Sequence, residues 1–135
     1  MDVQDYGHDV VGFLDRIEVT PLPNGIDWEL LHEVRYATGT GEVIYVPAGF
    51  ITDFASIPKF FRRVYQPATG KHRQGAVIHD YIYRTDSLNY TRKQADQVFL
   101  EIMELDGVSR FDRKAIYYSV RSGGKSSFIE RTTNG

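Results

Sequence analysis

The chain has 135 residues, a formal net charge of -2 and no cysteine. The lack of cysteine excludes disulfides and thiolate metal ligands, and the near-neutral charge gives no general attraction to nucleic acid or to anionic membranes. No apolar run approaches the roughly 20 residues that span a bilayer, and the first residues lack the basic and apolar regions of a signal peptide. We therefore expect one domain that stays in the cytoplasm where it is made, unless it leaves within an assembly or by lysis.

The first third of the chain predicts short antiparallel strands. Residues 1–10 are polar and predict an irregular arm. Strands are expected over residues 13–20, 28–37 and 42–46, because turn-forming residues separate segments in which apolar side chains recur at strand spacing. The last two strands should pair as a hairpin, so this part predicts a small antiparallel meander.

The rest of the chain predicts helices. A short amphipathic helix is expected over residues 59–65, and a longer one over residues 71–84. The longer helix carries one stripe of side chains: His72, Ala76, His79 and Tyr83.

The last two predicted helices have clear start and stop signals. Residues 91–94 form a capping box that opens a helix, and Gly107 ends it. The buried face of this helix should comprise Ala95, Val98, Phe99, Ile102 and Leu105. Another helix should start at residues 109–112, carry a stripe of Phe111, Ala115 and Tyr118, and end before Gly123. The fold class is thus α+β, an N-terminal β-meander packed on a C-terminal cluster of three to four helices.

His79 and Asp80 are the strongest candidates for a site, because they are adjacent in an otherwise apolar helical run. A polar group in such surroundings needs a partner, since burying it unpaired costs free energy. If the helix borders a cleft, His79 could act as a base or ligand whose second nitrogen a carboxylate holds, and Asp80 could bind a cation. Both could equally hold the preceding loop by hydrogen bonds, and the two interpretations are about evenly weighted.

Asp53 and Ser56 lie between two prolines that stiffen the chain. Ser56 is better explained as a helix-capping residue than as a nucleophile, whereas ligand and structural roles are equally supported for Asp53. Ser56 and His79, with Asp53 or Asp96, could form an acyl-transfer triad. The spacing gives that triad no specific support, because triads are recognised by geometry.

Asp96 lies at the edge of the apolar face of its helix. An antiparallel helix pair joined by residues 85–90 would bring it near His79 or Tyr83, where its carboxylate could orient the imidazole. It could equally pair with Arg84 or Arg92 in solvent, where the pair would contribute little. A set of basic residues could bind phosphate or an acidic partner, although a solvent-exposed face is the favoured interpretation. These residues are Lys59, Arg62, Arg63, Lys71 and Arg73.

Two motifs stand out, VPAGFITDFASIP at residues 46–58 and AVIHDYIYR at residues 76–84. With residues 92–96 and 117–124, they resemble a family of small proteins from bacteria and tailed phages, domain of unknown function 1353. The resemblance covers the central and C-terminal parts of the chain. It implies no established activity, but the phage members imply a virion or late-gene context.

The second motif also resembles the His-Asp helix of phospholipase A2 enzymes, which place His-Asp-x-x-Tyr on one helix and an orienting Asp on an antiparallel neighbour. This resemblance implies His79 as base, Asp80 as calcium ligand, Tyr83 as hydrogen-bond support and Asp96 as orienter. The chain departs from those enzymes in having no cysteines beside the pair and no Gly-rich calcium loop before it. The likeness is therefore one of geometry rather than of ancestry.

Two functions from different classes remain open. One is a phage-associated hydrolase that acts on an ester or amide of the cell envelope, with His79, Tyr83 and Asp96 in the roles just given. A calcium or zinc ion would be held by Asp80 or Asp53, and Ser56 and His72 would be further site residues. The other is a non-enzymatic virion component of a tail, neck or capsid, whose polar C-terminal arm, residues 125–135, another virion subunit or copy would hold. A module that binds a host protein is a weaker third. All three predict synthesis in the host cytoplasm.

Overall fold

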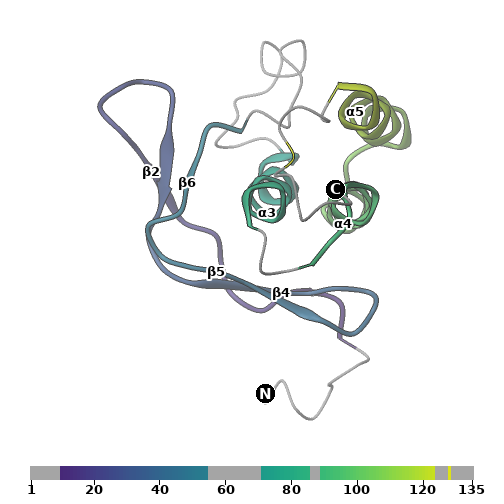
Figure 1. Cartoon of the computed structure of the whole chain (residues 1–135), viewed down its shortest axis with the longest axis horizontal. Helices are drawn as coiled ribbons and strands as arrows, with labels where there is room; N and C mark the ends of the chain where they lie inside the picture. Colours follow the sequence, from purple (N-terminus) through teal and green to yellow (C-terminus); the bar gives the residue numbers. More distant parts are fainter. Residues whose placement is uncertain (1–9, 55–70, 86–88, 124–127, 129–135) are drawn as a thin grey trace. The chain divides into compact units, whose positions relative to one another are not determined.

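The computed structural model describes residues 10–54, 71–85, 89–123 and 128. The chain divides between Asp53 and Phe54 into two compact units, with strands β1 to β6 in the first and helices α3 to α5 in the second (Figure 1). Strands come first and helices follow, which confirms the predicted α+β class. Residues 1–9 of the expected arm and the expected helix over residues 59–65 lie outside the described residues.

The first unit contains two three-stranded antiparallel sheets. One has the strand order β1–β4–β5, formed by Gly12–Phe13, Val34–Ala37 and Val43–Val46. The other has the order β2–β3–β6, formed by Val19–Pro21, Trp28–Leu30 and Ile51–Thr52. The β4–β5 pair confirms the predicted hairpin and sets Tyr36 opposite Ile44, and both of these side chains are buried.

Two of the predicted strands are each divided between the two sheets, a correction to the simple meander. Residues 13–20 contribute to β1 and β2, and residues 28–37 contribute to β3 and β4. Asp15 ends the β1 pairing, because its carboxylate takes the place of a backbone carbonyl and accepts the Arg35 amide at 2.9 Å. The same carboxylate binds the Arg35 guanidinium at 2.8 and 2.9 Å. Hydrophobic alternation cannot reveal such a change of sheet.

In the second unit, α4 (Arg92–Leu105) packs against both α3 (Arg73–Arg84) and α5 (Arg110–Gly123) (Figure 1). The predicted capping box is confirmed at Thr91, whose hydroxyl accepts the Gln94 amide at 3.1 Å while its own amide donates to the Gln94 side chain at 2.8 Å.

None of the helices among the described residues has the length and hydropathy that crossing a membrane requires.

The predicted buried faces are partly confirmed. In α4 the predicted apolar residues are buried except Leu105, which is half exposed in the last turn.

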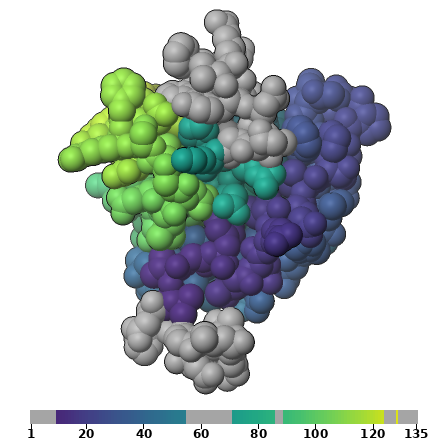
Figure 2. Space-filling view, turned by 180° about the vertical axis from the view of Figure 1, so that it is seen from behind, coloured from purple at the N-terminus to yellow at the C-terminus, as the bar shows by residue number. Residues whose placement is uncertain are grey.

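The predicted stripe of α5 is wrong. Phe111 and Tyr118 are 80% and 63% exposed, whereas Ile116 and Val120 are buried. Figure 2 shows the part of the chain that contains α5, in green to yellow, over a broad area of the surface. Because the helix carries two apolar stripes, its partner decides which one is buried. Ile116 and Val120 can be buried without any polar group. A buried Tyr118 would instead need a hydrogen-bond partner for its hydroxyl.

Gly75 allows α3 and α4 to pack closely. A Cβ atom at this position would lie 2.7 Å from Cδ1 of the Phe99 ring, which is fully buried. We predict that Gly75→Ala lowers the free energy of unfolding by about 1–2 kcal/mol in urea denaturation, because overpacking a filled core outweighs the helix propensity that alanine adds.

Gly123→Ala is the matched control, since a Cβ at Gly123 would meet none of the described atoms within 4 Å. A Gly75→Ala protein as stable as the wild type, or equal losses in the two variants, would contradict the close packing inferred at Gly75.

Candidate functional site

One buried carboxylate gathers polar groups from all three helices. Asp96 lies in the second turn of α4 and is fully buried. Its Oδ1 lies 2.6 Å from Nε2 of His79 and 2.6 Å from the hydroxyl of Tyr83, both on α3. Its Oδ2 accepts a 2.7 Å hydrogen bond from Arg121 on α5. We call these four residues the Asp96 cluster.

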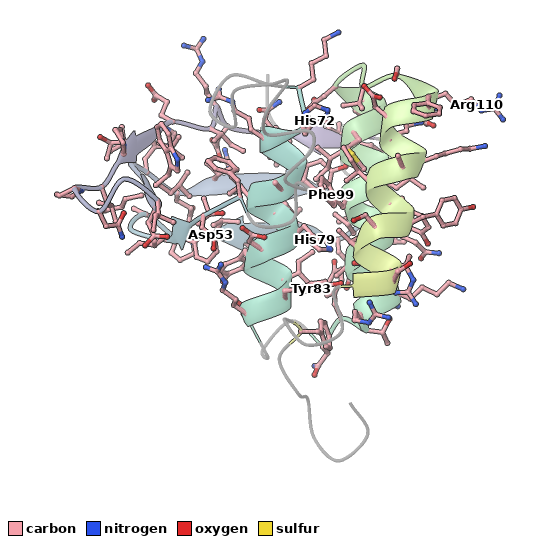
Figure 3. All side chains as sticks on the ribbon, turned by 90° about the horizontal axis from the view of Figure 1, so that it is seen from above. Asp53, His72, His79, Tyr83, Phe99 and Arg110 are labelled. Carbon is pink, nitrogen blue, oxygen red and sulfur yellow. The ribbon has the colours of Figure 1, made fainter. Side chains whose placement is uncertain are left out.

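The local sequence explains how the cluster assembles. His79 and Tyr83 are four residues apart, so they lie on one face of α3, and Figure 3 shows both on the side of α3 toward Phe99. The capping box at Thr91 fixes the start of α4, which places Asp96 one turn into that helix. The helix pair therefore brings Asp96 to both side chains, which is one of the two arrangements that the sequence left open.

The hydrogen bonds keep Asp96 ionised in spite of its burial. Burial alone would raise the pKa of this carboxyl, but the hydrogen bonds from His79, Tyr83 and Arg121 outweigh it, so the pKa lies below the ordinary value of 3.8. An ionised carboxylate only accepts hydrogen bonds. Nε2 of His79 is therefore the donor, and a neutral imidazole in this state has its lone pair on Nδ1.

Tyr83 remains a hydrogen-bond donor at neutral pH. Burial, together with the hydrogen bond to Asp96, raises the pKa of its hydroxyl above the ordinary value of 10.0. The phenol therefore stays protonated and supports Oδ1 of Asp96 next to the imidazole.

Aromatic rings hold the imidazole in place. The His79 ring lies with its centroid 4.1 Å from that of Tyr83 and 4.9 Å from that of Phe99. The Tyr83 ring in turn meets the edge of Phe128, with the ring centroids 5.1 Å apart. Phe128 belongs to the expected C-terminal arm, so at least this residue of the arm contacts its own helices.

Arg92 lies next to the Asp96 cluster, in the first turn of α4. Its Nη1 donates to the backbone carbonyls of Val120 and Arg121, both at 3.1 Å, and lies 3.8 Å from Oδ2 of Asp96. The sequence predicts Arg92 as one possible solvent-exposed partner of Asp96 and does not predict Arg121. The signal for Arg121 was present, because this residue lies in the segment 117–124 that carries part of the family resemblance.

The other predicted site residues are not members of the cluster. Asp80 is buried on α3, one residue after His79. His72 is the residue before α3, about 10 Å from His79 along the helix axis, and burial lowers the pKa of its imidazole. Asp53 follows β6 in the first compact unit, and Ser56 lies outside the described residues.

No group of three or more His, Cys, Asp or Glu side chains that could hold a metal ion occurs among the described residues. Ligand roles for Asp80 and Asp53, and the calcium or zinc ion itself, stay predictions.

A family model described as "Protein of unknown function (DUF1353)" matches residues 28–120, more than two-thirds of the chain. The chain belongs to this family. The matched range contains both motifs that suggested the resemblance, and it includes His79, Tyr83 and Asp96. Comparisons with curated proteins and with solved structures find no significant match.

The Asp96 cluster makes the stability of the protein depend on pH. The pKa of Asp96 is lower in the folded than in the unfolded chain, so its ionised form contributes stability above about pH 4 that is lost as pH falls through the folded pKa. We predict that Asp96→Asn costs roughly 3 kcal/mol or more at pH 7, because it leaves the Arg121 charge without its buried partner. The gap between the variant and the wild type should narrow at pH 3.

Urea denaturation at the two pH values measures this effect. Glu104→Gln is the control, because the exposed Glu104 carboxylate pairs with Arg113 at 3.4 Å and its loss should cost less than about 1 kcal/mol. Equal losses for the two variants at pH 7, or a gap for Asp96→Asn that does not change with pH, would contradict an ionised Asp96 at the centre of the cluster.

Proposed function

We propose that the chain is a small phage-associated hydrolase in which His79 is the general base and Asp96 orients its imidazole. The observation that carries this proposal is the 2.6 Å hydrogen bond between Nε2 of His79 and the buried carboxylate. With the proton on Nε2, the lone pair on Nδ1 would take a proton from the attacking water. Asp96 would then stabilise the imidazolium that forms.

Tyr83 and Arg121 act as positioning residues in this mechanism. Each donates one hydrogen bond to Asp96, Tyr83 to Oδ1 and Arg121 to Oδ2. These bonds hold the carboxylate plane fixed relative to the imidazole, as the groups around an orienting carboxylate do in other enzymes. The role proposed for Tyr83 is therefore support of Asp96 rather than contact with the substrate.

The substrate we propose is an ester or amide of the cell envelope. The likeness to the His-Asp helix of phospholipase A2 enzymes supports a water-attacked carbonyl, because the same residue types occupy the same relative positions. The resemblance to small phage proteins supports an envelope target, since a phage must pass that barrier.

The test compares wild type, His79→Gln and His32→Gln on phospholipid vesicles and on peptidoglycan. Glutamine at 79 can still donate to Asp96 but cannot take a proton, so we predict that hydrolysis falls by about 100-fold or more while the melting temperature changes little. His32→Gln is the matched control, because Nε2 of His32 also contacts a carboxylate, Glu18 at 2.8 Å, but at the surface. Cleavage that His79→Gln leaves unchanged would refute the proposal.

A second candidate function is a structural virion component, and the burial of the cluster favours it. Asp96 and His79 are 0% and 2% exposed, and their hydrogen bonds join three helices. On this alternative the cluster is a structural latch, and the chain should be recovered by mass spectrometry in purified particles. Recovery from the lysate alone, together with hydrolysis that depends on His79, would favour the enzyme.

A divalent cation held by Asp80 or by Asp53 is a separate proposal. Such an ion would polarise the substrate carbonyl. We predict that equilibrium dialysis finds about one calcium or zinc ion per chain, that Asp80→Asn loses it, and that Glu104→Gln keeps it. Equal metal content in Asp80→Asn and in the wild type would contradict the role of Asp80.

A further inference from the structure

Two arginines share one carboxylate at the Asp96 cluster. Arg121 donates to Oδ2 of Asp96 at 2.7 Å, and Nη1 of Arg92 lies 3.8 Å from the same oxygen. In the described part of the chain, Asp96 is the one carboxylate within ion-pair distance of either guanidinium. Since His79 adds no negative charge, the two cations exceed the anion by one full charge among the described residues.

Arg113 shows what a balanced arginine looks like in the same helices. It also donates to a backbone carbonyl, that of Val108 at 3.1 Å, and its side chain is 23% exposed. However, it faces a carboxylate of its own, Glu104 at 3.4 Å. The contrast is that Arg113 has a carboxylate of its own, whereas Arg92 and Arg121 share that of Asp96.

Both guanidinium groups reach solvent, unlike the groups beside them. The side chains of Arg121 and Arg92 are 29% and 21% exposed, whereas those of Asp96 and His79 are 0% and 2% exposed. Each arginine is held at a fixed point, Arg121 by Asp96 and Arg92 by two carbonyls near the end of α5. A guanidinium has five N–H donors, and these contacts use only part of that capacity.

We propose that Arg92 and Arg121 form a binding site for a phosphate group beside His79. Fixed guanidinium groups bind phosphate oxygens through paired, charge-assisted hydrogen bonds. Among the described residues, a phosphate would also offset the positive charge by which Arg92 and Arg121 exceed Asp96. As a substrate subsite, which rests on the proposed hydrolase, the site would hold the phosphate of an envelope lipid or of a soluble phosphoester.

The experiment titrates the full chain with inorganic phosphate at constant ionic strength, followed by calorimetry and by NMR shifts of labelled arginine side chains. The variants are Arg92→Gln, Arg92→Lys and the matched control Arg113→Gln, each checked for folding by its thermal melt. We expect saturable binding to the wild type and to Arg113→Gln, weakened about tenfold or more in Arg92→Gln and partly restored in Arg92→Lys. Arg92 is the position of choice because its contact with the buried carboxylate is the longer one.

Acetate tests whether the site prefers phosphate to a carboxylate. Glycerophosphate and vesicles of anionic phospholipid test whether the phosphate comes from a soluble phosphoester or from a lipid. Tighter binding of glycerophosphate, or tighter binding of the vesicles, supports the site and identifies the source as soluble or lipid. No saturable binding of phosphate to the wild type, equal binding to Arg92→Gln, or tighter binding of acetate than of phosphate would overturn the proposal. Phosphate binding without hydrolysis supports the site and rejects the hydrolase, whereas hydrolysis without phosphate binding rejects the site alone.

Discussion

The ionised carboxylate of Asp96 is the constraint on which the helical unit depends. A buried charge is tolerated only where partners replace the water it has lost. Asp96 finds those partners on α3 and α5, in His79, Tyr83 and Arg121. Because each helix supplies part of the shell, the packing of the helices and the state of the imidazole cannot vary independently. Gly75 serves the same arrangement, since the Phe99 ring that lies against it also contacts His79.

This dependence explains why one cluster supports two interpretations of function. A structural latch requires only that the hydrogen bonds be strong and buried, and the distances of 2.6 to 2.7 Å meet that requirement. A general base requires in addition that the carboxylate direct the proton of the imidazole to Nε2. The low pKa of Asp96 provides that direction, because an ionised carboxylate can only accept. The solvent-reaching arginines add a feature that a latch does not need.

The sequence predicted best what local chemistry decides. The capping box at Thr91, the stop at Gly107 and the β4–β5 hairpin follow from short-range rules, and the structure confirms them. The meeting of His79 with Asp96 was one of two arrangements that helix spacing and an antiparallel pair left open. Features that depend on contacts between distant segments could not be predicted from local sequence rules. The ion pair of Arg121 with Asp96, and the division of two strands between sheets, require knowledge of how distant segments pack.

The proton position on His79 tests the central claim most directly. NMR of ¹⁵N-labelled histidine distinguishes the two ring nitrogens of each imidazole, and His79→Gln assigns the signals. We predict that Nε2 of His79 carries a proton in a strong hydrogen bond to Asp96 and that Asp96→Asn alters this proton signal. A neutral ring with its proton on Nδ1, or an Nε2 proton that Asp96→Asn leaves unchanged, would contradict it.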